Sequence, residues 1–425
     1  MMKIRSLFLS VLLLAVSFSM MANSFVTASC GHLYRDGKPY YFIGTNLWYA
    51  PVLASEGEGG NRERLLSELD MLHKMGINNL RILVGADAGS ANANSVVPCL
   101  QARSGVLNDT LLSGLDYLLV EMGKRDMTGV FYLTNSWDWS GGYGYYLREV
   151  GYGDSPDATA DYNAYVDYAA DFLRDDRARK LYLDFVERIV SRTNRYTGVA
   201  YKDDPTIMSW QICNEPRPFS KETKENFARW ISETAKLIKR LAPHQLVSTG
   251  SEGLYGCEVD EQLCERIHND PNVDYLTLHI WPINWRWATA DRLFQALPNV
   301  YLKSGEYIDI HERIARNIGK PMVIEEFGYA RDNNFYYPGA GTRSRDSFYN
   351  FVFSKVLESK KNQGFLAGCN FWGWGGAGRP AGKTWRPGND YLCDPPHEPQ
   401  GWYSVYDCDS TTLSAISEAV RLLEK

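Results

Sequence analysis

The 425-residue sequence lacks several features that would direct its function elsewhere. It has no lysine- and arginine-rich block and a formal net charge of −6, so we expect no nucleic-acid partner, because phosphate binding needs a basic face. Its 7 histidines and 8 cysteines form no CxxC pairs or clusters with metal-ligand spacing. We therefore expect no metal and no cofactor. The longest apolar run, residues 7–16, is too short to span a bilayer, so no membrane span is expected.

Residues 1–24 have the pattern of a signal peptide. Lys3 and Arg5 precede the short apolar run, and small and polar residues follow it up to Ser24. This order is typical of a secretory signal, and it predicts a secreted or periplasmic protein. Cys30 lies far beyond the apolar run, after Thr-Ala-Ser, so we do not expect a lipoprotein anchor.

Export would allow disulfide bonds to form. Cys393 and Cys408 flank one loop and are the first expected pair. Cys257 and Cys264, seven positions apart in the numbering, are the second.

Aromatic residues are abundant, with 12 tryptophans and 27 tyrosines. Many stand beside glycine, asparagine or aspartate rather than within apolar runs. Flat rings in polar loops suit the apolar C–H faces of sugars, because aromatic side chains combine a large apolar surface with restricted geometry. The alternative is that these rings anchor the long loops of a large domain.

Apolar segments alternate with amphipathic segments eight times, without an internal repeat or a linker. Such alternation predicts a parallel α/β architecture. Residues 25–425 are therefore expected to form a single (β/α)8 TIM barrel with elaborated βα loops. A small N-terminal β-ribbon, turning at Asp36-Gly37, would close its bottom. The expected strands are 41–46, 79–84, 129–134, 207–213, 246–249, 275–279, 321–326 and 368–371, and the expected helices include 62–75, 109–125, 177–195, 222–241, 306–318, 344–360 and a last one from 412 onward.

Two of these strands end in carboxylates. The fourth stops at Asn214-Glu215-Pro216, because proline cannot donate to a sheet ladder. The seventh ends in Glu325-Glu326. Barrel enzymes place their chemistry at the carboxyl ends of the strands. There the two carboxyl groups could lie about 5–5.5 Å apart, the spacing of a retaining glycosidase.

The same residues resemble a known family. Asn214-Glu215-Pro216 and Glu326-Phe327-Gly328 are similar to the catalytic signature of family 5 glycoside hydrolases, in clan A. Within that family the chain, from about residue 25 to 425, resembles the endo-β-1,4-mannanases. The similar stretches are 44–49, 80–82, 139–142, 201–207, 248–253 and 371–374.

The resemblance implies that Glu215 is the acid/base and Glu326 the nucleophile. Glu326 is chosen over Glu325 because the family's nucleophile directly precedes an aromatic–glycine pair. Adjacent side chains of a strand point to opposite sides. Glu325 is accordingly expected to be a structural carboxylate outside the barrel.

The resemblance also implies a set of substrate-binding residues. Arg81 would hold the nucleophile ionised, and Asn214 would bond the sugar's 2-hydroxyl. His279 matches the histidine after the sixth strand, and Trp372 matches the floor of the cleaved-sugar subsite. Each has a structural alternative: a salt bridge for Arg81, an Asx turn for Asn214 and a core position for His279.

One position departs from the family. Many members carry a tyrosine that touches the nucleophile where this chain has Trp281. An indole N–H is only a donor, so either Trp281 is a sugar platform or another hydroxyl assists Glu326. Further candidates for sugar contact at the strand ends are Trp48, Asn135, Trp137, Trp139, Trp285 and Trp374.

These features favour endo-acting hydrolysis of β-1,4-mannosidic bonds in mannan, glucomannan or galactomannan by retaining double displacement. The expected partner is a β-mannan-type polysaccharide or oligosaccharide, and we expect a monomer. One alternative is a β-1,4-glucanase of the same family, a cellulase or xyloglucanase. Another is a non-catalytic glycan-binding barrel, although a binder would have no need of both Glu215 and Glu326.

Overall fold

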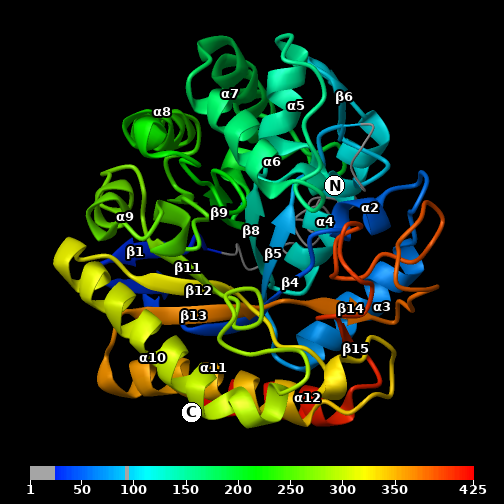
Figure 1. The fold of residues 1–425 in the computed structure, drawn as a ribbon, viewed down its shortest axis with the longest axis vertical. Coiled ribbons are helices and arrows are strands. Elements are labelled where there is room, and N and C mark those ends of the chain that lie inside the picture. Colours follow the sequence, from blue (N-terminus) through cyan, green and yellow to red (C-terminus); the bar gives the residue numbers. More distant parts are fainter. Residues whose placement is uncertain (1–23, 91–94) are drawn as a thin grey trace, which may run out of the picture.

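Eight parallel strands form the centre of the computed structural model (Figure 1), which describes residues 24–90 and 95–425. Their hydrogen-bonded order is β10-β9-β8-β5-β4-β13-β12-β11. A parallel bridge between Ser248 and Tyr275 joins the two ends of this order, so the sheet closes and the predicted (β/α)8 barrel is confirmed. The strands are β4 (Phe42–Asn46), β5 (Asn79–Leu83), β8 (Thr128–Tyr132), β9 (Ile207–Gln211), β10 (Leu246–Ser248), β11 (Leu276–Ile280), β12 (Met322–Phe327) and β13 (Leu366–Phe371).

Helices surround the barrel and bury one apolar face each. In helix α8 (Lys224–Leu241), for example, the buried side chains include Phe227, Trp230 and Ile231, which recur at helical spacing. The order of these helices confirms the strand–helix alternation expected from the sequence. They are α3 (Arg62–Lys74), α4 (Asp109–Lys124), α7 (Asp176–Val190), α8 (Lys224–Leu241), α9 (Glu261–His268), α10 (Leu293–Ile318), α11 (Arg343–Asn362) and α12 (Ser410–Leu423).

Helix α10 begins much earlier than the predicted 306–318. It contains Pro298 in its first two turns, a residue that normally disfavours a helix interior because it lacks an N–H donor. Leu293, Leu297 and Val300 are nevertheless buried. Their spacing continues the apolar face of the later turns, so packing overrides the unfavourable proline.

The N-terminal ribbon closes one end of the barrel, as predicted. It consists of β1 (Thr27–Ser29), β2 (His32–Arg35) and β3 (Lys38–Pro39). Val26 and Leu33 share a separate buried cluster with barrel residues, among them Val130, Met208 and Val323. The bottom of the barrel is therefore filled by apolar side chains, and chemistry is left to the opposite end.

The loops that follow the strands carry additional short elements, in agreement with the expected elaborated loops. They are α2 (Ala50–Ala54), β6 (Gln101–Arg103), β7 (Val106–Leu107), η1 (Asp138–Ser140), α5 (Gly142–Glu149), α6 (Tyr162–Ala169), η2 (Ala170–Leu173), η4 (Lys221–Thr223), η5 (Tyr255–Cys257), η6 (Asp332–Asn334), β14 (Trp374–Gly376) and β15 (Val405–Tyr406), while η3 (Tyr201–Asp203) precedes β9. None of the described helices is both long and apolar enough to cross a membrane. Except for Ser24, the expected signal peptide lies outside the described residues.

The predicted disulfide bonds are not formed. All eight cysteines lie in the described residues, and all are free thiols. Cys393 is buried whereas Cys408 is exposed. The Cys393 thiol is directed at the Asn46 carbonyl, 3.8 Å away, and not at Cys408. Cys257 and Cys264 are both buried and lie close enough for their thiols to hydrogen-bond. They form no disulfide bond with each other.

Candidate active site

Glu215 and Glu326 come together at the carboxyl end of the barrel. One carboxylate oxygen of each and one ring nitrogen of His279 lie within 4.8 Å of one another. Glu215 is 9% exposed and Glu326 is 2% exposed. Carboxyl groups about 5–5.5 Å apart characterise retaining glycosidases, whereas inverting enzymes need about 6.5–9.5 Å. The spacing found here fits the retaining class.

The backbone at Glu215 is strained. Its φ of +49° lies in the left-handed region that residues other than glycine rarely adopt. Two hydrogen bonds hold this conformation: Glu215 N–H donates to the Gly250 carbonyl at 2.9 Å, and Ser136 Oγ donates to the Glu215 carbonyl at 2.5 Å. Loops after β8, β9 and β10 therefore fix the position of one carboxyl group.

The Glu215 carboxyl is bonded through both oxygens. Trp137 Nε1 donates to Oε2 at 2.6 Å, and His279 Nδ1 lies 2.8 Å from Oε1. Burial raises the pKa of Glu215 above its usual value, while Arg217 and the bonds from Trp137 and Trp281 lower it. A raised pKa favours the protonated carboxyl that a general acid requires.

His279 links the two carboxyl groups. Its Nδ1 also lies 3.3 Å from Glu326 Oε2. Burial, together with the nearby Arg81, lowers the pKa of His279 well below its usual value. The ring is therefore neutral, and Nδ1–H can donate to either carboxylate.

Arg81, in β5, reaches four partners inside the barrel. Its Nη1 contacts Glu326 Oε1 and donates to Asn46 Oδ1 at 3.1 Å. Its Nη2 donates to Asn214 Oδ1, and its Nε donates to Gln211 Oε1, both at 2.8 Å. One fully buried guanidinium thus orients the Glu326 carboxylate and the Asn214 amide together.

This arrangement decides which carboxyl group carries the negative charge. Burial raises the pKa of Glu326, Arg81 opposes that rise, and the charge of Glu215 adds to it. Two carboxyl groups this close do not both ionise easily. Arg81 touches Glu326 and not Glu215, so its positive charge favours the ionised form of Glu326 and leaves the proton to Glu215.

Glu325 lies inside the barrel, which corrects the expectation that it would point outward. In the pairing of β11 with β12, Leu278 faces Ile324 and His279 faces Glu326. Glu325 is the extra residue of this bulge, so the alternation of sides is interrupted.

The buried Glu325 carboxylate is held inside the barrel by its own partners. It accepts hydrogen bonds from Gln211 Nε2 at 2.5 Å and from the Tyr275 hydroxyl at 3.1 Å. Its Oε2 lies 3.9 Å from Arg81 Nε. Glu325 is a second counter-ion for Arg81, although it makes no contact with Glu215.

Asn135 supports Asn214. The Asn214 amide donates to Asn135 Oδ1 at 3.2 Å, and the two residues also form a parallel bridge. The same oxygen accepts the backbone N–H of Trp137 at 3.1 Å. Asn135 thereby aligns the amide expected at the 2-hydroxyl and the indole that bonds Glu215.

Two groups of tryptophans surround these residues. Trp372 and Trp281, which directly follow β13 and β11, pack edge to face with ring centroids 6.0 Å apart. Trp48 and Trp139 form the second group, with centroids 5.4 Å apart. The structure also places Trp285 partly exposed and Trp374 fully buried.

Trp48 and Trp139 connect to the loop after β13 rather than directly to the carboxyl groups. Trp48 Nε1 donates to the Cys393 carbonyl at 2.6 Å. The Trp139 ring stacks on His397, with centroids 6.2 Å apart. Both tryptophans are nearly fully buried, Trp48 at 2% and Trp139 at 4% exposure.

Arg217 and Glu252 belong to the site although the sequence did not indicate their pairing. Arg217 Nε donates to Glu252 Oε2 at 2.6 Å, and the guanidinium carbon lies 5.5 Å from the Trp137 ring centroid. Burial raises the pKa of Glu252 to about 7, with Arg217 opposing and Glu215 adding to the rise. The sequence could have indicated these two residues only by their position, because each follows a barrel strand.

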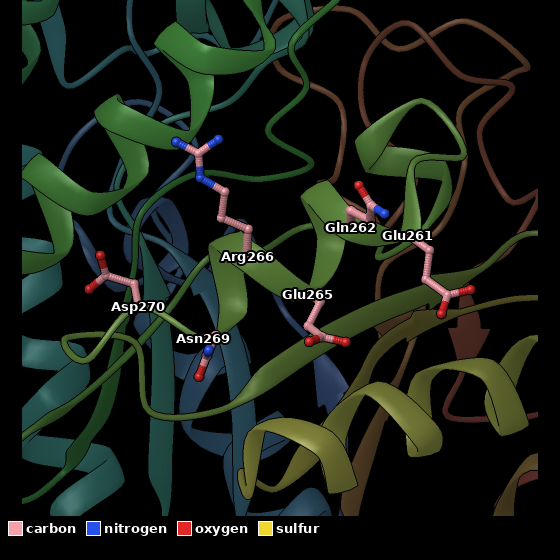
Figure 2. A pocket seen from close by; sticks show the side chains of 6 residues that line it. All are labelled: Glu261, Gln262, Glu265, Arg266, Asn269 and Asp270. Atoms are coloured by element: carbon pink, nitrogen blue, oxygen red, sulfur yellow. The ribbon is translucent and has the colours of Figure 1, made fainter.

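Within the described residues we find no hydroxyl hydrogen-bonded to Glu326. The side chain of Trp281 instead lies beside Glu215, where it lowers the pKa of that carboxyl. A surface hollow beside α9, lined by Glu261, Gln262, Glu265, Arg266, Asn269 and Asp270 (Figure 2), lies on one outer helix. It includes no strand end, so it does not compete with the site in the barrel.

Comparison with known proteins agrees with this geometry. Residues 23–425 match a family model described as "GH family 5 beta-mannosidase-like". A rice protein (Oryza sativa subsp. japonica) named "Putative mannan endo-1,4-beta-mannosidase 9" is 29% identical, covering 85% of this chain and 84% of its own.

Solved structures show the same fold. A family 5 mannosidase from Rhizomucor miehei is 34% identical with a TM-score of 0.85, covering 95% of this chain and 98% of that one. An endo-1,4-beta-mannanase from the same organism, 21% identical, has a TM-score of 0.68 and covers 95% of this chain and 100% of that one. The chain therefore belongs to the mannosidase-like group of glycoside hydrolase family 5.

Proposed function

We propose that the protein is an endo-acting glycoside hydrolase that cleaves β-1,4-mannosidic bonds with retention of configuration. The observation that carries this proposal is the close Glu215–His279–Glu326 group, with Arg81 on the Glu326 side alone. Curated relatives named mannan endo-1,4-beta-mannosidases support the choice of polymer. The substrate would be mannan, glucomannan or galactomannan.

In the proposed mechanism each of these residues has a step. The Glu326 carboxylate attacks the anomeric carbon while Glu215 protonates the departing glycosidic oxygen. The glycosyl–Glu326 ester is then hydrolysed by a water molecule that Glu215, now ionised, deprotonates. Arg81 orients the nucleophile, and Asn214 is placed to bond the 2-hydroxyl. His279 stabilises whichever carboxylate is charged.

Trp372 would form the floor under the cleaved sugar, and Trp281 would line the same subsite. Trp48, Asn135 and Trp139 would act around it, Asn135 by holding Asn214. We propose that the protein acts as a monomer, without cofactor or metal, after export to the periplasm or the medium. The pattern of residues 1–24 supports export.

A second candidate function is release of single mannose units from chain ends. The Trp139–His397 stack joins the loop after β8 to the loop after β13, across the ends of β5 and β4. The neighbouring Glu398 has its pKa raised by burial, and the charges of Asp394 and Glu215 add to the rise. A wall so close to Glu215 would shorten the cleft on one side. The 34% identical R. miehei structures are also named mannosidases.

The test is reducing-sugar release from mannan and from carboxymethylcellulose, by the wild type beside Glu215→Gln and Glu326→Gln. We expect fast cleavage of mannan, slow cleavage of cellulose and losses of about 10³-fold or more in both variants. Faster cleavage of cellulose would favour the glucanase alternative. No cleavage of either polymer would favour the binding barrel. Products from mannohexaose separate the two modes, since mannose alone at early times indicates release from chain ends.

A further inference from the structure

A chain of aromatic rings runs from the catalytic centre to the rim of the barrel. Trp281, which lies beside Glu215, packs against Tyr403 with ring centroids 5.1 Å apart. Tyr403 in turn packs against Trp402 at 4.6 Å. Tyr403 is buried, whereas Trp402 is partly exposed. The chain therefore emerges from the interior at Trp402.

Trp402 is tied to the loop that follows the nucleophile strand β12. Its Nε1 donates to Asn334 Oδ1 at 3.0 Å, and the Asn334 amide donates to the Tyr336 hydroxyl, also at 3.0 Å. Gly401, with φ of +93°, faces the Tyr336 carbonyl so closely that a Cβ would lie 1.8 Å from its oxygen. Only glycine allows this approach, so the two loops are docked firmly.

The docked loop presents two large rings to solvent. Phe335 is 42% exposed and Tyr337 is 54% exposed, and their ring centroids lie 5.4 Å apart. Aromatic rings offer a large apolar face of fixed geometry, which suits the C–H face of a sugar. We infer that Phe335 and Tyr337, with Trp402, form a platform that binds a β-1,4-linked mannan chain beyond the sugars at the catalytic centre.

The occupant follows from two observations. Trp402 lies only two ring contacts from Trp281 and bonds the loop that carries Phe335 and Tyr337, so a polymer that leaves the catalytic centre could reach the platform. Its components are flat rings with polar groups beside them, such as Asn334 and the Tyr336 hydroxyl, and this combination suits the C–H face and hydroxyls of a sugar.

This inference rests on the proposed function, because it assumes that the protein acts on mannan. The test is the double variant Phe335→Ala/Tyr337→Ala, in which both altered side chains are exposed and folding should be preserved. We expect KM for polymeric mannan to rise by about fivefold to tenfold. The retardation of the protein in mannan-containing native gels should decrease to a similar extent. The kcat/KM on mannotriose should stay within about twofold of the wild type, because a short substrate does not reach the platform.

Tyr152→Ala is the matched control. Tyr152 is 42% exposed and follows α5, in the loop after β8, whereas the platform follows β12 across the barrel. This variant should retain the wild-type KM for mannan. An unchanged KM and unchanged gel retardation in the double variant would overturn the platform while wild-type cleavage of mannan still supports the proposed function. If the wild type cleaves no mannan, the proposed function itself fails.

Discussion

Trp137 Nε1 lies 2.6 Å from Glu215 Oε2, so the proposed acid/base receives an indole N–H at the carboxyl group that would hold and release the proton. The bond favours the ionised carboxylate and lowers the pKa of Glu215 against the effect of burial. The indole is itself covered by Arg217, whose guanidinium carbon lies 5.5 Å from the ring centroid. The acid strength of Glu215 thus depends on a tryptophan and on the charge next to it.

Trp137→Phe should raise the pKa of Glu215, because it removes a donor to the ionised form. The alkaline limb of the kcat/KM profile should move to higher pH. In addition, kcat should fall by about tenfold, as expected for loss of about 1.4 kcal/mol. A pH series on mannotriose measures both effects. An unchanged alkaline limb would show that the indole does not control Glu215.

Glu252→Gln should have the opposite effect on pH dependence. It removes a carboxylate near Glu215 and leaves the Arg217 cation unpaired. An unopposed cation favours the ionised form and lowers the pKa of Glu215. The alkaline limb should therefore move to lower pH. A movement to higher pH would contradict the inference that the Arg217 cation acts on Glu215.

Arg81→Lys should reduce kcat by about 10²–10³-fold while the barrel stays folded. A lysine keeps the charge but loses the planar fork that binds Glu326, Asn214 and Gln211 together. Circular dichroism checks the fold and steady-state kinetics checks the loss. A variant within about threefold of the wild type would show that charge alone suffices.

Glu325→Gln distinguishes a supporting carboxylate from the nucleophile. The amide cannot serve as a counter-ion for Arg81, and it places an N–H₂ group among donors such as Gln211 Nε2. We expect a lower free energy of unfolding by about 1–3 kcal/mol and a moderate loss of kcat. Urea unfolding and kinetics measure these. A loss of kcat as large as that of Glu326→Gln would mean that Glu325 takes part in the chemistry.

Most of the barrel could be predicted because each strand and helix has its own local pattern. The predicted strand ends placed Glu215 and Glu326 at one rim, where the structure has them. The start of α10 was missed because Pro298 locally disfavours the helix that packing supports. The inward position of Glu325 was missed because its cause is a bulge in the pairing with β11.

Other parts of the site depend on contacts that sequence spacing does not report. Arg217 and Glu252 pair across two separate loops. The expected disulfide between Cys393 and Cys408 failed because nearness in the sequence does not make two thiols approach, and one of them is buried against Asn46.

The most direct test of the central claim is trapping of the covalent intermediate. The wild type would be treated with 2-deoxy-2-fluoro-β-mannosyl fluoride, digested and analysed by mass spectrometry, with Glu326→Gln as the control. We expect one fluoromannosyl group on Glu326 and none in the control, because Glu326 bears the charge of the pair. A label on Glu325 or Glu215 would contradict the assignment of the nucleophile. An α-configured first product from mannan, seen by proton NMR, would contradict retention itself.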